Sequence, residues 1–363
     1  MNVPTDLFTP VRLGPYELPN RIVMAPMTRL RAIDSIPQPL MAEYYAQRAS
    51  AGLIVTECTM VDPLSNGYLN CPGIFSAAQI SGWQQITAAV RAAGGRIFLQ
   101  LWHSGPISHP SLLAGQQPVA PSSIAPRGTL HTPMGKVNLE TPRALETEEI
   151  PEIVAQFARG AENAWAAGFD GIELHGAFGY LIDRFLQDGS NQRSDRYGGM
   201  VENRVRFLLE IVDVVTAVWG SDRVGIKLSP SNTFYGMVDA NARATFGYVL
   251  QALSPKNLAY VHLMEPNEKD LETGKVIPNV LDALGEAYTS TIITNGGYDR
   301  DKGNAVLASE KAALVSFGRP FIANSDLPER LRLGVELNTP DVKTFYAPGS
   351  EGYTDYPTLA QSK

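Results

Sequence analysis

Short apolar runs alternate with longer amphipathic segments along most of the chain. Eight runs, most of them rich in Ile, Val, Leu and Phe, are continuously apolar, which is typical of strands buried on both faces of a parallel sheet. We predict strands at residues 21–27, 52–58, 96–103, 168–175, 223–230, 258–265, 291–297 and 312–319. Between them, apolar residues at helical spacing predict helices at residues 77–93, 148–167, 201–219, 240–253 and 302–308.

Eight strands that alternate with helices in 363 residues predict an α/β fold, a (β/α)₈ TIM barrel that spans residues 1–363 as a single domain. The alternative is a doubly wound sheet with an added domain. No Gly-x-Gly-x-x-Gly follows the first predicted strand, which disfavours that alternative.

Two segments fall outside the repeat. Residues 11–18 read as a hairpin with a turn at Gly14-Pro15, and we expect it to plug the amino-terminal mouth of the barrel. Residues 104–145 form a long insertion after the third strand, rich in Pro, Gly and Ser. Because irregular insertions of this length are usually functional, we favour a lid over the site above a plain surface loop.

Composition narrows the functional class. Hydrophobic residues make up 44% of the chain and charged residues 18%, enough apolar material for a large core. The net charge of −7 and the pI near 5.4 argue against a nucleic-acid or anionic-membrane partner. No secretion signal or membrane-spanning run is recognisable, so we expect a soluble cytoplasmic protein. Cys58 and Cys71 match no zinc, iron–sulfur or disulfide spacing, and we predict no metal site.

A histidine and a tyrosine follow the fourth predicted strand. The segment reads His175-Gly-Ala-Phe178-Gly-Tyr180. Imidazole and phenol are neutral groups suited to holding a carbonyl oxygen and delivering a proton, and barrel active sites lie at the carboxyl ends of strands. Phe178 stands where a polar group is expected, and its side chain has no hydrogen-bond donor.

Glycines end the seventh and eighth predicted strands. Gly297 and Gly318 allow close approach of a phosphate to backbone N–H groups, and Arg319 offers a bidentate partner. This is the usual phosphate position in such barrels, although paired glycines are also ordinary turn residues. Three polar residues on other strands are candidate contacts to an extended polar ring system, although each alone is equally compatible with packing or solvent exposure: Thr28, Gln100 and Lys227.

Several motifs together resemble the old yellow enzyme family of flavin-dependent ene reductases. The resemblance extends from about Leu7 to Pro357. It rests on Ala25-Pro-Met-Thr-Arg29, Gln100-Leu-Trp-His103, His175-Gly-Ala-x-Gly-Tyr180, Ser190-Asn-Gln-Arg-Ser-Asp-Arg-Tyr-Gly-Gly199, Phe317-Gly-Arg319 and Glu351-Gly-Tyr-Thr-Asp-Tyr-Pro357.

The resemblance implies a non-covalent FMN at the carboxyl end of the barrel. Cys58 takes a place that is often Ala, and Thr28 favours the better-known subgroup over the thermophilic-like one, which has Cys there. The lack of a Cys cluster excludes the iron–sulfur dienoyl-CoA reductase relatives. The implied cofactor-binding residues are Ala25, Pro26, Met27, Thr28, Cys58, Gln100, His175, Lys227, Gly297, Gly318 and Arg319.

The resemblance also implies a ping-pong reaction. NADPH, or NADH as the alternative donor, reduces the flavin, and hydride then moves from N5 to the β-carbon of an enone or nitroalkene. Tyr180 protonates the α-carbon, while His175 and a His or Asn at position 178 hold the carbonyl oxygen. In this chain Phe178 replaces the second donor, a loss of ~3 kcal/mol or about a hundredfold in rate.

Three interpretations of Phe178 stay open. The protein is a slow reductase with altered substrate orientation, it uses another donor such as Tyr353 or a water, or Phe178 is a deliberate substitution in an engineered variant. We favour the last, because the surrounding motif is intact. Substrate contacts are accordingly expected from His175, Phe178, Tyr180 and Tyr353.

Two other functions compete with the reductase. One is a phosphate-dependent aldolase or isomerase, with Lys227 as a Schiff-base lysine. The other is a non-catalytic flavin- or ligand-binding barrel, which Phe178 keeps open. We weigh the reductase well above either, and expect a monomer or a homodimer.

Overall fold

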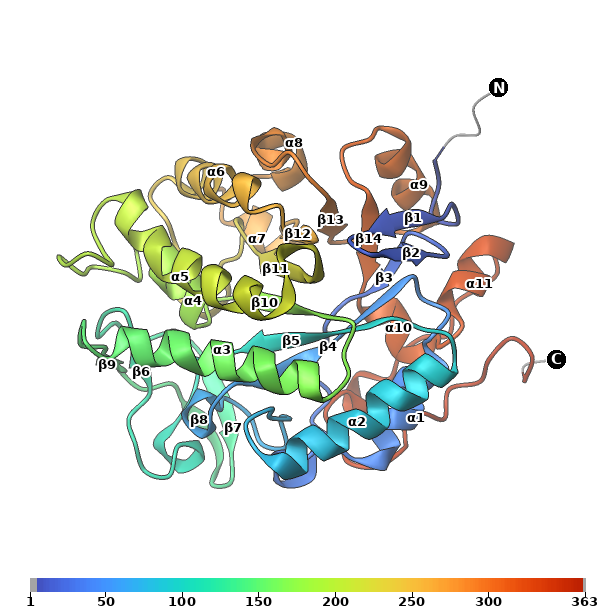
Figure 1. Cartoon of the computed structure of the whole chain (residues 1–363), viewed down its shortest axis with the longest axis horizontal. Coiled ribbons are helices and arrows are strands. Elements are labelled where there is room, and N and C mark those ends of the chain that lie inside the picture. Colours follow the sequence, from blue (N-terminus) through green and yellow to red (C-terminus); the bar gives the residue numbers. More distant parts are fainter. Residues whose placement is uncertain (1–4, 362–363) are drawn as a thin grey trace.

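A closed barrel of eight parallel strands forms the centre of the computed structural model, which describes residues 5–361 (Figure 1). The remaining six residues of the predicted 1–363 domain lie outside the described part. Each barrel strand overlaps one predicted apolar run, so the predicted (β/α)₈ barrel is confirmed. The strands are β3 (Ile22–Met24), β4 (Leu53–Met60), β5 (Ile97–Trp102), β10 (Gly171–Gly176), β11 (Val224–Leu228), β12 (Tyr260–Met264), β13 (Ile292–Asn295) and β14 (Leu314–Phe317).

Helices surround the barrel (Figure 1). The five predicted helices are α2 (Ala77–Ala92), α3 (Ile150–Ala166), α5 (Val201–Trp219), α6 (Ala242–Leu253) and α9 (Arg300–Ala308). The prediction missed the other α-helices of the described residues: α1 (Pro39–Gln47), α4 (Leu181–Leu186), α7 (Glu268–Glu272), α8 (Val280–Leu284), α10 (Arg319–Ala323) and α11 (Leu327–Leu333). Among the described residues, none of these helices is long and apolar enough to cross a membrane.

The start of α2 shows how local sequence sets a helix boundary. The Ser76 side chain accepts a hydrogen bond from Gln79 N, and the Gln79 side chain accepts one from Ser76 N. This reciprocal capping box satisfies backbone donors that the first helical turn leaves free. The helix then buries Trp83, Ile86 and Val90 against the barrel, as their spacing predicts.

A two-stranded hairpin covers the amino-terminal ends of the barrel strands. β1 (Val11–Leu13) and β2 (Tyr16–Leu18) pair antiparallel around Gly14. Leu13 and Leu18 are buried in one apolar cluster with Leu53 and Leu314, which begin two barrel strands. Gly14 has φ +53°, and a Cβ there would lie 1.9 Å from the Asp222 carbonyl oxygen, so only glycine fits this turn.

The insertion at 104–145 packs over the carboxyl-terminal side of β5 and β10. It contains two small sheets: β6 (Val119–Ala120) pairs with β9 (Arg143–Ala144), and β7 (Thr129–Thr132) pairs with β8 (Gly135–Asn138). Ile107, Leu130 and Leu139 are buried in an apolar cluster that also contains Trp102 and Tyr180. The insertion therefore adjoins the predicted site, and its opening and closing as a lid stays a prediction.

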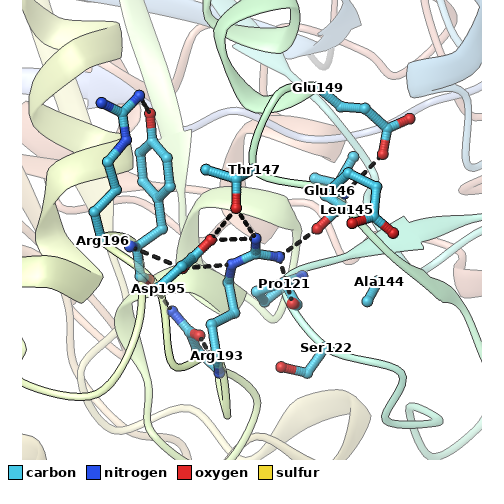
Figure 2. Close-up of polar contacts among 12 residues, drawn as sticks. Pro121, Ser122, Ala144, Leu145, Glu146, Thr147, Glu149, Arg193, Asp195 and Arg196 are labelled. Atoms are coloured by element: carbon cyan, nitrogen blue, oxygen red, sulfur yellow. Dashed lines mark hydrogen bonds and ion pairs between the residues drawn. The ribbon is translucent and has the colours of Figure 1, made fainter.

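A polar network joins Pro121 and Leu145 of this insertion to the loop before α5 (Figure 2). Arg193 donates to Asp195 at 2.5 Å, to the Pro121 carbonyl at 3.1 Å and to the Leu145 carbonyl. Thr147 Oγ1 donates to the same carboxylate at 2.5 Å. The run 190–199, to which sequence reasoning assigned no chemistry, thus has a clear structural role.

We expect Asp195→Asn to destabilise the protein at neutral pH, with the loss disappearing in acid. The hydrogen bond from Arg193 holds the pKa of Asp195 well below its usual range, whereas the unfolded value is about 3.9. The carboxylate's contribution is therefore complete above about pH 5 and is lost as pH falls through the folded pKa. Because Asp195 is partly exposed, solvent screening limits this contribution to about 1 kcal/mol.

Urea denaturation at pH 7 and at progressively lower pH measures this difference. Asp213→Asn, which breaks the exposed ion pair with Lys256, is the matched control and should change stability little. A difference between wild type and Asp195→Asn that stays constant down to pH 3 would contradict the linkage.

Candidate active site

Neighbouring strands bring the predicted polar residues to one end of the barrel. His175 pairs in register with Lys227, and Gln100 pairs with Cys58. Thr28 follows β3, and its Oγ1 lies 3.2 Å from the Cys58 Sγ atom. Carboxyl ends of parallel strands share one rim, so residues distant in sequence meet there.

The rim closes through β3 and β14. Ala25 N donates to the Phe317 carbonyl at 3.0 Å. A Cβ on Gly318 would lie 3.7 Å from Met27 Sδ, an ordinary contact. Three further predicted residues complete this part of the rim: Pro26 is partly buried after β3, Gly297 follows β13 with φ +69°, and Arg319 is exposed at the start of α10.

His175 is buried, and its Nδ1 atom has no hydrogen-bond partner in the structure. Burial, reinforced by the nearby Lys227 charge, lowers the pKa of His175 to about 3. The imidazole is therefore neutral at physiological pH and carries one N–H donor and one acceptor. An unsatisfied buried nitrogen is costly unless a ligand pairs with it, which marks His175 as a ligand-binding group.

Tyr180 lies beside His175, with their rings edge to face at 4.9 Å. Burial raises the pKa of Tyr180 well above its ordinary value, so the phenol keeps its proton at working pH. Its Oη lies 2.7 Å from Tyr68 Oη, which in turn lies 3.0 Å from Tyr235 Oη. Three phenols thus form a hydrogen-bonded chain.

Sequence reasoning missed Tyr68 and Tyr235. They lie in the loops after β4 and β11, on the same side of the barrel as Tyr180. Aromatic residues with polar tips in loops that follow barrel strands were the available signal. Their contact with Tyr180 depends on how these loops fold over the rim.

Phe178 lies beside the side chains of His175 and Lys227, two of the polar residues predicted for the site. Its ring is 6.0 Å from the His175 ring, and Lys227 Nζ lies 5.5 Å from its centroid. Phe178 N donates to Ser229 Oγ at 2.8 Å. The residue has φ +57°, a left-handed conformation that Asn and Asp adopt more readily than a bulky aromatic residue.

Tyr353, a predicted substrate contact, has a buried Oη without a hydrogen-bond partner among the described residues. It is fully buried, and its ring stacks on Tyr44 at a centroid distance of 4.0 Å. The guanidinium groups of Arg29 and Arg31 lie over the same ring at 5.0 and 4.4 Å. The carboxyl-terminal segment therefore packs Tyr353 against Tyr44, Arg29 and Arg31, and its contact with substrate stays a prediction.

A buried carboxylate orients Gln100 beneath the rim. Gln100 Nε2 donates to Glu173 Oε1 at 2.7 Å, and His262 Nδ1 lies 2.9 Å from the other Glu173 oxygen. Burial alone would raise the pKa of Glu173, but His262, Lys227 and Gln100 outweigh it and lower the pKa. The ionised carboxylate holds the amide so that the Gln100 carbonyl oxygen stays available as an acceptor.

Within residues 5–361, no three His, Cys, Asp or Glu side chains are grouped to hold a metal ion.

Comparisons with known proteins agree with this geometry. Residues 6–338 match the family model described as NADH:flavin oxidoreductase / NADH oxidase family. The chain is 42% identical to 12-oxophytodienoate reductase 1 of Oryza sativa subsp. japonica, covering 98% of this chain and 93% of the relative.

Two solved structures are similar throughout. Morphinone reductase superposes with a TM-score of 0.94 at 45% identity, covering 99% of this chain and 98% of that one. The old yellow enzyme homologue from Zymomonas mobilis gives 0.94 at 41% identity, covering 98% of this chain and 100% of the other. The protein therefore belongs to the NADH:flavin oxidoreductase / NADH oxidase family, the family of the old yellow enzymes.

Proposed function

We propose that the protein is an FMN-dependent ene reductase that uses NADPH, or NADH as the alternative donor, to reduce activated C=C bonds of enones and nitroalkenes. The observation that carries the proposal is the pair at the rim: a neutral His175 with an unpartnered Nδ1 beside a neutral, buried Tyr180. Relatives named 12-oxophytodienoate reductase and morphinone reductase support a small organic substrate.

The residues at the rim fit FMN. Lys227 is buried, which lowers its pKa to about 8 and leaves it mostly charged at pH 7. Its cation and the Gln100 carbonyl oxygen would face the polar edge of the flavin ring. Gly297, Gly318 and Arg319 would hold the phosphate, because backbone N–H groups at glycines and an exposed guanidinium favour an anion.

Side chains of the protein then bind the substrate oxygen and supply the proton. FMN, when bound, would supply the hydride that goes to the β-carbon. His175 donates to the carbonyl or nitro oxygen as negative charge develops there. Tyr180 gives its Oη proton to the α-carbon, and the proton is replaced through Tyr68 from the less buried Tyr235.

The competing functions receive less support. Family membership gives no support to a phosphate-dependent aldolase or isomerase. A non-catalytic flavin-binding barrel remains the outcome against which activity must be tested.

Anaerobic titration of the purified yellow protein tests the proposal. We expect NADPH to bleach the flavin absorbance, and cyclohexenone or a nitroalkene to restore it. Recovery should be relatively faster with the nitroalkene, because a nitro group needs less polarisation than a ketone and Phe178 provides no second donor. Repeating the titration with NADH in place of NADPH shows which nicotinamide reduces the flavin faster.

Two outcomes would contradict the proposal. A flavin that neither nicotinamide bleaches would indicate a ligand-binding barrel. A flavin that is bleached but recovers only with oxygen would indicate an oxidase without ene reductase activity.

A further inference from the structure

The chain has two cysteines, and they touch. The Sγ atoms of Cys58 and Cys71 lie 3.8 Å apart, and Cys71 Sγ donates to the Cys58 carbonyl at 3.2 Å. A core side chain contacts on the order of ten others, so two randomly placed residues in a chain of 363 would meet in only a few per cent of cases. Efficient packing of small apolar side chains would not by itself bring these two cysteines into contact.

The backbones beside the two thiols run parallel. Met60, at the end of β4, forms a parallel bridge with Gly73; Met60 N donates to the Pro72 carbonyl at 2.9 Å, and Ile74 N donates to the Met60 carbonyl at 3.0 Å. Cys58 and Cys71 have the same separation in sequence, 13 residues, as this bridged pair. This bridge fixes the two segments side by side next to the thiols, whose Sγ atoms are already in contact.

The pair adjoins the candidate active site. Cys58 pairs in register with Gln100, and its Sγ lies 3.2 Å from Thr28 Oγ1. Both cysteines belong to the apolar cluster that contains Trp102 and Tyr180. A covalent change at these sulfurs therefore occurs next to the residues proposed to hold the flavin and the substrate.

We propose that Cys58 and Cys71 are a modification site that hydrogen peroxide converts to an intramolecular disulfide. The Cys58 thiolate attacks one peroxide oxygen and breaks the O–O bond, which yields a sulfenic acid and, after protonation of the leaving hydroxide, one water. Cys71 then loses its proton, attacks the Cys58 sulfur and expels a second water. Two thiols are oxidised by two electrons and one peroxide is reduced by two.

The surroundings of the two cysteines determine which thiol reacts with peroxide first. Cys58 retains slight exposure and contacts the Thr28 hydroxyl, whereas Cys71 is fully buried. Burial raises the pKa of the Cys71 thiol well above its ordinary value, so it is the poorer initial nucleophile. Cys71 attacks only once the sulfenic sulfur lies beside it.

The expected consequence for the flavin rests on the proposed function. Closing the S–S bond draws the Cys58 sulfur toward Cys71 and away from the Thr28 hydroxyl. Cys58 and Thr28 are two of the residues proposed to line FMN. We therefore expect the oxidised protein to bind FMN more weakly than the reduced protein.

Thiol counting on the FMN-loaded protein tests the modification without any turnover. After peroxide treatment and denaturation, we expect the two free thiols to fall to none, with a mass decrease of about two hydrogens and a peptide that joins Cys58 to Cys71. Dithiothreitol should restore both thiols. Cys71→Ala, outside the proposed flavin contacts, should instead gain oxygen at Cys58 and form no cross-link.

Three results would overturn the proposal: both thiols survive, Cys58 is oxidised to a sulfinic acid while Cys71 stays free, or the disulfides join separate chains. A cross-link that leaves FMN affinity unchanged would overturn only the proposed effect on the flavin. A cross-linking, FMN-binding protein that reduces no enone would overturn the proposed function and leave the modification site intact.

Discussion

Tyr180→Phe is expected to slow the oxidative half-reaction with an enone by ~10²–10⁴-fold, the usual range for loss of a positioned general acid. Reduction of the flavin by NADPH should stay close to the wild-type rate, because no proton from Tyr180 is needed there. The substitution removes the Oη atom that lies 2.7 Å from Tyr68 Oη and keeps the ring beside Trp102 and His175. The loss is therefore chemical rather than structural.

Stopped-flow measurement of each half-reaction separates these effects. Tyr68→Phe is the matched control, because it removes the hydrogen-bond partner of Tyr180 and leaves the proposed donor in place. We expect Tyr68→Phe to cost much less than Tyr180→Phe. Equal slowing of both half-reactions in Tyr180→Phe would remove Tyr180 from the role of proton donor.

The pH dependence of the same oxidative half-reaction gives a second readout. His175, with its pKa lowered to about 3, is neutral throughout the range above pH 4, and Tyr180 keeps its proton well beyond pH 9. Neither His175 nor Tyr180 changes charge between about pH 5 and pH 7, so the wild-type rate should be flat over that range. Above it the rate should change, because Lys227, whose pKa burial lowers to about 8, loses the charge proposed to face the flavin. A step near pH 6.5 would show that His175 titrates normally.

Phe178→Asn is expected to raise the oxidative rate with cyclohexenone by about a hundredfold, because it restores one preorganised donor worth ~3 kcal/mol in the transition state. The ring of Phe178 lies 6.0 Å from that of His175, so we expect a polar side chain at this position to reach the same part of the substrate. The backbone there has φ +57°, which Asn tolerates better than Phe. The local conformation is therefore better suited to the polar residue than to the one present.

Phe178→Leu is the control for shape. It is apolar and has no donor, so a gain seen with Asn but not with Leu assigns the effect to the hydrogen bond. The gain should be smaller with a nitroalkene than with cyclohexenone. If Asn and Leu give equal rates, the missing donor does not limit turnover, and Phe178 acts only on substrate orientation.

The pattern of apolar residues predicted the barrel well because parallel strands buried on both faces must be continuously apolar. Every predicted strand overlaps an observed one, and the five predicted amphipathic segments are helices. Most of the missed helices have five to seven residues, too few turns for a clear helical period, whereas α1 is as long as the predicted α9 but has Pro at its first position and two adjacent tyrosines.

The rim residues could be located from sequence because they directly follow or end predicted strands. Strand register, which the barrel topology fixes, sets the positions of His175, Lys227, Gln100 and Cys58. Tyr353 could not be located in this way. It lies on a terminal segment whose path depends on docking against Arg29 and Arg31.

The sequence by itself determined the barrel, the rim on which the chemistry lies, and the identities of His175, Phe178 and Tyr180, because strand periodicity and chain order are local properties. Only the tertiary structure decided which loop residues meet them. Tyr68 and Tyr235 join Tyr180 through contacts between segments distant in sequence, and Cys71 joins Cys58 where the loop after β4 returns to that strand. Such contacts depend on how irregular loops pack, and no local pattern of polarity encodes that packing.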